Sequence, residues 1–262
     1  MPATIGILDS GVGGLSVLRE IRALLPGHPL LYVGDSAWCP YGNKPADEIR
    51  ERVSAHTDFL LEQGAGLVVV ACNSATIAAV EHLRTTHPVP FVGMEPAVKP
   101  AAALTRSGVI GVLATEASLA GEKFHRLVDT HARDDLRVIT VPCPKFVTLV
   151  EEGTLSGPEV EAAVHEYTDP LLAAGADVLV LGCTHYPFLR ETIQQVAGPD
   201  ITLLDTGPAV AQRVASLLPE DDGKGTTTPP VLYTTGEVGQ LKRLLPELLP
   251  GMEVVVEAMP GP

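Results

Sequence analysis

The stretch Val178–Phe188, VLVLGCTHYPF, is the part of the chain that decides how the rest is interpreted. Its first four residues are apolar and predict a strand buried on both faces, which stops at Gly182. Cys183 and His185 then fall on a loop before a helix that accepts Pro187 in its first turn. The unpaired N–H groups of a helix N-terminus favour a thiolate over a thiol. The stretch therefore predicts a reactive cysteine.

The same construction occurs at Leu67–Thr76, LVVVACNSAT, where an apolar run leads into Cys72. Asn73 and Ser74 follow as candidates for the N-cap of the next helix. One such cysteine would more often be a small buried apolar side chain. Two strand-end cysteines, each opening a helix, instead indicate a doubled active site.

Strand and helix patterns alternate along the whole chain. Strands are expected at 5–8, 30–33, 67–71, 91–94, 109–113, 137–141, 178–181, 202–204, 231–234 and 254–256. Helices are expected at 15–25, 46–63, 73–84, 96–104, 118–129, 158–174, 187–196 and 238–248, with an irregular loop at 36–45 and a polar break at 219–230. Such alternation predicts an α/β protein with two similar domains, each a mostly parallel sheet flanked by helices.

Composition narrows the class of protein and its partners. The 262 residues suffice for one large domain or for two. The formal net charge of −14, with no basic stripe, argues against a nucleic-acid partner. No apolar run approaches the roughly 20 residues of a membrane span, and the N-terminus lacks a secretion signal. We therefore expect a cytoplasmic protein without a membrane partner.

The four cysteines show no CxxC pair and no metal-ligand spacing, which fits a reducing compartment and predicts no metal site. Cys39 and Cys143 each precede a proline, and we expect them to be structural or incidental. None of the lysines lies in an obvious buried catalytic context, as a pyridoxal enzyme would require. We therefore expect chemistry without a cofactor.

Ligands of open parallel sheets bind beyond the carboxyl ends of the strands. Five residues with reactive or charged side chains are expected at such ends: Asp9, Asp35, Cys72, Cys183 and Asp205. If the two halves of the chain face each other across a cleft, the two thiols approach one small ligand from opposite sides. The active site is accordingly expected in that cleft.

Several of these residues have a plainer interpretation. Gly11-x-Gly13 followed by Asp35 imitates a dinucleotide fingerprint, but Ser16 stands at the third glycine position and Asp9 would lie beside the pyrophosphate. Asp9 could instead cap the next helix, and His185 could be a loop histidine with its hydrogen bonds satisfied. By pattern alone, Glu151 and Glu152 suggest a solvated face, and Tyr41 suggests packing.

Two opposed thiols suit one class of reaction. A racemase removes a proton from one face of a Cα atom and delivers another to the opposite face. One base cannot reach both faces of a tightly held substrate, whereas a thiolate and a thiol can exchange roles between directions. The pair therefore favours racemisation.

The chain resembles the cofactor-independent aspartate/glutamate racemase superfamily nearly from end to end. The resemblance is carried by GILDSGVGGLSVL, YVGDSAWCPYG, VVACNSAT, FVGMEPAVKPA, LVEEG, LGCTHYPFL, DTGPAVA and VLYTTG. It implies Cys72 and Cys183 as the acid/base residues, Asp9 assisting Cys72, His185 assisting Cys183, and Glu151 as a further acid. The implied substrate contacts are Asp9, Ser10, Tyr41, Gly42, Asn73, Ser74, Thr184 and His185.

The resemblance also implies an activity and an architecture. The activity is interconversion of L- and D-glutamate, which supplies D-glutamate for peptidoglycan in the bacterial cell wall. The architecture is a first domain of residues 1–96 with 208–262 and a second of 97–207, and many family members are homodimers. The sequence departs from the family at Trp38, where a basic residue is frequent, and in the stretch ATEASLAGEKF at 114–124.

Three other functions stay open at this point. A racemase acting on aspartate or another amino acid would share the thiol pair and differ in its side-chain pocket. A non-catalytic binding protein could keep the fold, although the two intact cysteines argue against it. A one-base decarboxylase or lyase of the superfamily would be expected to lack one of the cysteines.

Overall fold

The computed structural model describes residues 2–131, 135–218 and 228–260. The chain divides into two units, Met1–Met94 with Gly207–Pro262, and Glu95–Thr206. The division into domains expected from the sequence, residues 1–96 with 208–262 and residues 97–207, stays a prediction. Most of the polar break expected at 219–230 lies outside the described residues.

The first unit is built on a six-stranded sheet in the order β10-β9-β2-β1-β3-β4, with every neighbouring pair parallel. Residues of β1 and β2 are buried almost throughout, as expected for strands covered on both faces. The strands are β1 (Thr4–Asp9), β2 (Leu30–Gly34), β3 (Ala65–Val70), β4 (Phe91–Val92), β9 (Val231–Thr234) and β10 (Val255–Ala258).

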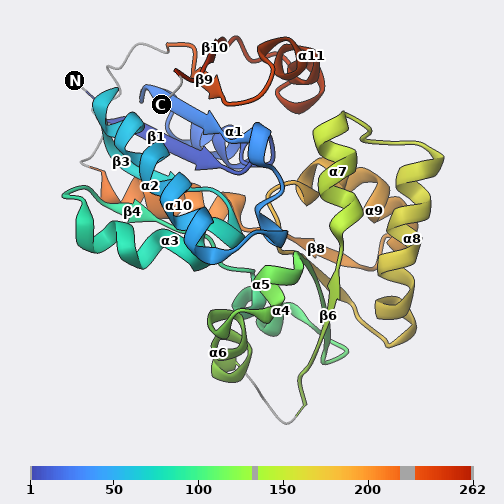
Figure 1. Ribbon diagram of the computed structural model, residues 1–262. Helices are drawn as coiled ribbons and strands as arrows, with labels where there is room; N and C mark the ends of the chain where they lie inside the picture. The colour runs from blue at the N-terminus through green and yellow to red at the C-terminus, as the bar shows by residue number, and fades with distance from the viewer. Residues whose placement is uncertain (1, 132–134, 219–227, 261–262) are drawn as a thin grey trace. The chain divides into compact units, whose positions relative to one another are not determined.

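Helices cover both faces of this sheet (Figure 1). The connections from β1 to β2 and from β2 to β3 run in opposite directions across the sheet, so right-handed crossovers place α1 and α2 on opposite faces. α10 packs against α1, and α3 packs against α2. The helices are α1 (Leu15–Leu24), α2 (Ala46–Glu62), α3 (Asn73–Thr86), α10 (Gly207–Leu217) and α11 (Val238–Leu248).

The second unit has a four-stranded parallel sheet in the order β6-β5-β7-β8. Its strands are β5 (Val109–Ala114), β6 (Arg137–Pro142), β7 (Val178–Leu181) and β8 (Thr202–Leu204). Its helices are α4 (Val98–Leu104), α5 (Glu116–Ala120), α6 (Glu122–His131), α7 (Pro144–Glu152), α8 (Pro158–Ala173) and α9 (Arg190–Ala197).

The two sheets repeat one topology. The order β2-β1-β3-β4 of the first unit matches β6-β5-β7-β8 of the second, which makes β3 and β7 equivalent strands. Cys72 follows β3 and Cys183 follows β7, so the two thiols occupy equivalent places in their units. The α/β class and the parallel sheets expected from the sequence are confirmed.

Three local expectations need correction. The single helix expected at 118–129 is two helices, α5 and α6, because the backbone of Gly121 is extended with ψ 137°. The helix α7 was not expected, although Pro144 begins it and Gly153, in the left-handed region, ends it. The loop at 36–45 contains two short 3₁₀ turns, η1 (Ser36–Trp38) and η2 (Tyr41–Asn43).

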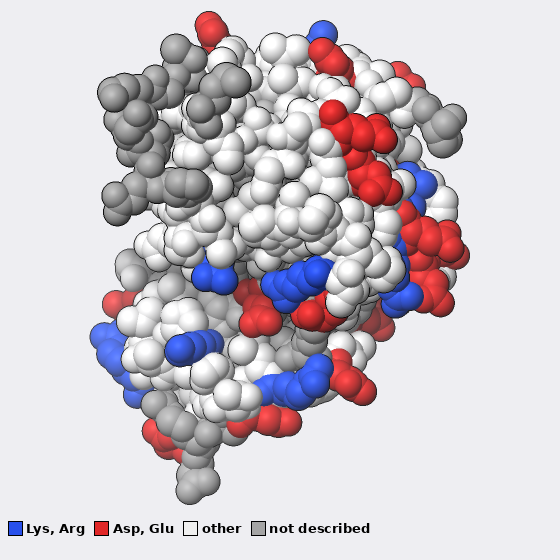
Figure 2. Space-filling model, turned by 90° about the vertical axis from the view of Figure 1, so that its left-hand side faces the viewer, with Lys and Arg blue, Asp and Glu red and all other residues white. Residues whose placement is uncertain are grey.

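Two surface properties bear on partners. Among the described residues, no helix combines the length and the apolar character needed to cross a membrane. On the face drawn in Figure 2, the described Lys and Arg side chains lie among Asp and Glu side chains.

Candidate active site

Cys72 lies between β3 and α3 and is the N-cap of the helix. Its backbone is extended, and its Sγ accepts a hydrogen bond from the backbone N–H of Ala75 at 3.5 Å. Asn73 and Ser74, the expected N-cap candidates, are already helical, so that expectation is wrong. The thiol itself therefore lies at the N-terminus of α3, where it accepts the N–H of Ala75 in the first helical turn.

Ser10 connects Cys72 to Asp9. The Sγ of Cys72 lies 3.8 Å from the Oγ of Ser10, and that hydroxyl donates to Oδ1 of Asp9 at 3.3 Å. All three residues are buried at the carboxyl ends of the neighbouring strands β1 and β3. The arrangement forms a hydrogen-bonded relay from a carboxylate to a thiol.

The glycine-rich turn after β1 holds this relay in place. Oδ1 of Asp9 also accepts from the N–H of Gly11 at 2.8 Å, and Tyr32 donates to the carbonyl of Gly11 at 2.6 Å. A Cβ atom on Gly14 would lie 2.7 Å from Cβ of Asp9, so no larger residue fits there. The N–H of Gly11 is therefore used internally and is not presented to a pyrophosphate, which removes support from the dinucleotide interpretation.

The other expected contacts of the first unit lie around this thiol. Tyr41, Asn73 and Ser74 are buried, while Gly42 is partly exposed. Tyr41 and Cys72 belong to one apolar cluster, and the Tyr41 hydroxyl donates to Oδ2 of Asp35 at 2.6 Å. Burial of the Tyr41 phenol, with the negative charge of Asp35 beside it, raises its pKa well above the ordinary value. Tyr41 therefore stays a neutral hydrogen-bond donor.

Cys183 occupies the equivalent position in the second unit. It follows β7 and Gly182, where a Cβ atom would lie 2.9 Å from the carbonyl oxygen of Leu113. The segment after Cys183 is a 3₁₀ turn, η3 (Tyr186–Leu189), and α9 begins only at Arg190. Pro187 lies in the first turn of the helical segment after Cys183, as expected, although that turn is 3₁₀ and becomes α-helical only at Arg190.

A histidine and a carboxylate lie beside the Cys183 thiol. The Sγ of Cys183 lies 3.6 Å from Nδ1 of His185, and Nε2 of the same ring lies 2.7 Å from Oε1 of Glu151. An ionised Glu151 only accepts hydrogen bonds, so it holds the imidazole proton on Nε2. Nδ1 of a neutral His185 is then the acceptor that faces the thiol. Thr184, the remaining expected contact, is buried between Cys183 and His185.

Glu151 is where reasoning from pattern alone failed. A solvated face was expected, but only 18% of this side chain is exposed, and α7 directs it to His185. Its neighbour Glu152 is exposed, as expected. Cues for α7 were present in the sequence, namely Pro144 at its start and Gly153 at its end.

The two further cysteines differ from the site thiols. Cys143 is fully buried, and its Sγ donates to the carbonyl of Val141 at 3.3 Å. Burial raises the pKa of the Cys143 thiol, and Cys183 nearby adds to the effect. Cys39 is half-buried. A structural role of Cys143 agrees with this environment.

The model of the family described as Asp/Glu/Hydantoin racemase matches residues 5–214. The chain belongs to this racemase family. Among racemases, the glutamate racemase of Pseudomonas putida KT2440 is 51% identical over 249 residues, which covers 94% of each chain. The glutamate racemase of Roseiflexus sp. is 53% identical over 217 residues, covering 82% of this chain and 79% of the relative.

Solved racemase structures share the fold. Escherichia coli glutamate racemase, solved with L-glutamate and the activator UDP-MurNAc-ala, has a TM-score of 0.88 and 34% sequence identity, covering 99% of this chain and 98% of that chain. The Thermus thermophilus glutamate racemase, solved with β-chloro-D-alanine, has a TM-score of 0.80 and 36% identity, covering 98% of this chain and 97% of that chain. The racemase family predicted from the sequence is thus confirmed.

Proposed function

We propose that this protein interconverts L- and D-glutamate by moving the Cα proton with two thiols and no cofactor. Cys72 serves one face of the Cα atom and Cys183 the other. The observation that carries the proposal is that equivalent strands, β3 and β7, each end at a thiol with its own proton relay. A single catalytic base would need only one such arrangement.

Each relay accepts the proton of its thiol when that thiol acts as the base. In one direction Cys183 gives its proton to Nδ1 of His185 and attacks the Cα proton as a thiolate, while Cys72 delivers a proton as a thiol. In the other direction the roles exchange, with Ser10 connecting Cys72 to the Asp9 carboxylate. Positioned acid/base groups of this kind contribute about 10²–10⁴-fold each to a rate.

The choice of glutamate rests on the relatives. The curated proteins at about half identity over most of the chain are glutamate racemases. The Escherichia coli relative was solved with L-glutamate, and the Francisella tularensis relative, 25% identical, with D-glutamate. Tyr41, Gly42, Asn73, Ser74 and Thr184 are the proposed substrate contacts besides the residues of the relays.

The proposal extends to cellular context. The four cysteines, all within the described residues, form no disulfide, and a two-thiol mechanism needs Cys72 and Cys183 reduced, which favours the cytoplasm. D-Glutamate made there would serve peptidoglycan synthesis. A homodimer belongs to the proposal through the family resemblance, and the molar mass in solution tests it.

Polarimetry on purified protein tests the function. Metal-free, pyridoxal-free protein should convert L-glutamate and D-glutamate each to the racemic mixture, with a kcat/KM for aspartate at least about 100-fold lower, since the pocket must reject the shorter side chain. Faster inversion of aspartate would assign the protein to the aspartate racemases. No inversion of either amino acid would overturn the proposal.

A further inference from the structure

Asp35, directly after β2, is a buried carboxylate at the centre of a hydrogen-bond network in the first unit. Arg52 on α2 binds it with two hydrogen bonds, from Nε at 2.5 Å and from Nη2 at 2.6 Å. Tyr41 donates to it at 2.6 Å and Thr235 at 2.7 Å, and Nε2 of His56 lies 3.2 Å away. Its side chain is thus bound by residues from three segments, namely the loop at 36–45, the helix α2 and the residues after β9.

The balance of these contacts fixes the charge of Asp35. Burial opposes ionisation of the carboxyl, but the hydrogen bonds from Arg52 and Tyr41, together with the nearby His56, outweigh burial and hold the pKa of Asp35 below the ordinary range. Arg52 is the only one of these partners that is always charged. Without Arg52, the network would keep a buried carboxylate that lacks its counter-ion.

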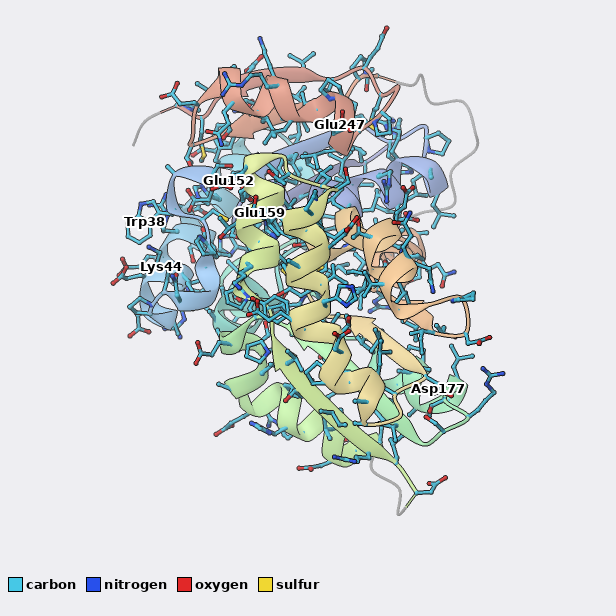
Figure 3. The ribbon with its side chains drawn as sticks, turned by 90° about the vertical axis from the view of Figure 1, so that its right-hand side faces the viewer. Trp38, Lys44, Glu152, Glu159, Asp177 and Glu247 are labelled. Carbon is cyan, nitrogen blue, oxygen red and sulfur yellow. The ribbon has the colours of Figure 1, made fainter. Side chains whose placement is uncertain are left out.

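Arg52 also contacts the loop at 36–45 directly, through the ring of Trp38. Its guanidinium carbon lies 4.4 Å from the centre of the Trp38 ring, and Nζ of Lys44 lies 5.3 Å from the same centre. Figure 3 shows Trp38 and Lys44 close together on the outer side of this loop. Planar guanidinium groups stack well on indole rings. Arg52 therefore holds both Trp38, at the start of the loop, and, through Asp35, Tyr41 further along it.

The loop at 36–45 carries two of the proposed substrate contacts, Tyr41 and Gly42. Residues 39 and 40 connect Trp38 to Tyr41 and Gly42, and Tyr41 packs in the same cluster as Cys72. Arg52 is not assigned to either proton relay, because its hydrogen bonds go to Asp35. The contacts of Arg52 are thus with Trp38 of this loop and with Asp35, which binds Tyr41 of the same loop.

We propose that Arg52 is a positioning residue, which holds Tyr41 and Gly42 in place to receive the substrate by joining Asp35 to Trp38. This inference rests on the proposed glutamate racemisation and deepens it. The loop belongs to substrate binding, so loss of Arg52 weakens binding more than it slows proton transfer.

Kinetics of three variants test this role. Arg52→Gln should raise KM for both enantiomers of glutamate by about 10-fold or more while kcat falls less than about threefold. Arg52→Lys should recover part of the loss, because lysine keeps the charge but neither the two-point hydrogen bonding nor the planar stack. Arg50→Gln is the matched control on the same helix, because Arg50 binds Asp47 and the carbonyl of Ala78, and it should leave KM unchanged.

Fluorescence gives a readout that does not depend on turnover. Trp38 is the only tryptophan of the chain, so its emission reports on this loop alone. Acrylamide should quench Trp38 at least about twofold more efficiently in folded Arg52→Gln than in the wild type or in Arg50→Gln. If the wild type inverted no glutamate, the proposed function would fail while this measurement still decided whether Arg52 holds the loop.

The outcomes separate positioning from simple stabilisation. A raised KM with increased quenching, partly reversed by lysine, supports the inference. An unchanged KM and unchanged quenching in folded Arg52→Gln overturns it, as does a lowered melting temperature accompanied by wild-type KM. If Arg52→Gln failed to fold, Arg52→Lys and Trp38→Ala would decide, since each keeps a positive charge beside Asp35 and each should still raise KM.

Discussion

Nε2 of His185 lies 2.7 Å from Oε1 of Glu151, and this contact turns the imidazole so that Nδ1 faces the thiol of Cys183. The two residues come from different elements, since α7 carries Glu151 and His185 precedes η3. The pair gives the second unit a thiol, an imidazole and a carboxylate in sequence. Its counterpart in the first unit uses a hydroxyl in place of the imidazole.

Glu151→Gln should lower kcat by about 10²-fold, since the amide no longer holds the imidazole proton on Nε2 with a full charge. KM should change less than kcat, because Glu151 acts on the substrate only through His185. Steady-state kinetics in both directions measure this. Glu152→Gln is the matched control on the same helix, and its exposed side chain should be replaceable without effect. Equal losses in the two variants would contradict the role of Glu151.

Ser10→Ala should interrupt the relay between Asp9 and Cys72. We expect kcat to fall about 10-fold, less than for direct removal of an acid/base group, because the thiol and the helix N-terminus remain. Ser16→Ala is the control, since Ser16 is also buried but its hydroxyl donates to the carbonyl of Gly13. The relay would be disproved by a kcat for Ser10→Ala equal to that of the control.

Thiol alkylation should abolish activity, and L- or D-glutamate should protect. Peptide mapping by mass spectrometry should find the inactivating label on Cys72 or Cys183. Cys143 should stay unlabelled, because it is fully buried and its burial raises the pKa of the thiol. Cys39→Ser should be inactivated as fast as the wild type. Inactivation that tracked labelling of Cys39 or Cys143, with Cys72 and Cys183 untouched, would refute the assignment.

Asp177 provides a pH-dependent contribution to stability. It accepts hydrogen bonds from the Thr105 hydroxyl at 2.5 Å and from the backbone N–H groups of Arg106 and Ser107 at 2.7 and 2.9 Å. Burial opposes its ionisation, but these bonds outweigh burial and lower its pKa to about 2. A lowered pKa stabilises the fold above the ordinary carboxyl range, and the contribution is lost as pH falls toward about 2.

Asp177→Asn should therefore reduce the free energy of unfolding by about 1–2 kcal/mol at neutral pH. Urea denaturation of the variant and the wild type at a series of pH values measures the difference, which should narrow below about pH 4. Asp200→Asn, at an exposed aspartate of the same unit, should show no such difference. A difference for Asp177→Asn that stayed constant down to about pH 3 would rule out this origin.

Short-range pattern predicted much of this structure. The strand before Cys183 could be read because a continuous apolar run ends abruptly at Gly182, and the tail strand and helix at 231–234 and 238–248 have the bounds expected. That Cys72 is the N-cap of α3 could not be predicted in this way. Asparagine and serine are the commoner N-cap residues, and both follow Cys72 in the sequence.

Contacts between residues far apart in the sequence could not be predicted from short-range patterns. Glu151 and His185 are 34 residues apart, and Asp35 and Thr235 are 200 apart. No periodicity links residues at these separations, so only the family resemblance pointed to Glu151. Nothing in the sequence pattern pointed to Arg52, because a charged residue on an amphipathic helix is ordinarily solvated.

The central claim is that Cys72 and Cys183 act on opposite enantiomers, and single alanine variants test it with a glutamate analogue that carries a leaving group at Cβ. Elimination needs only proton abstraction, so each variant should lose racemisation yet still eliminate from one enantiomer. By the family resemblance, Cys183→Ala should keep the D reaction and Cys72→Ala the L reaction. The account predicts these opposite preferences, and it would be contradicted if both variants favoured the same enantiomer or if either still racemised glutamate at near the wild-type rate.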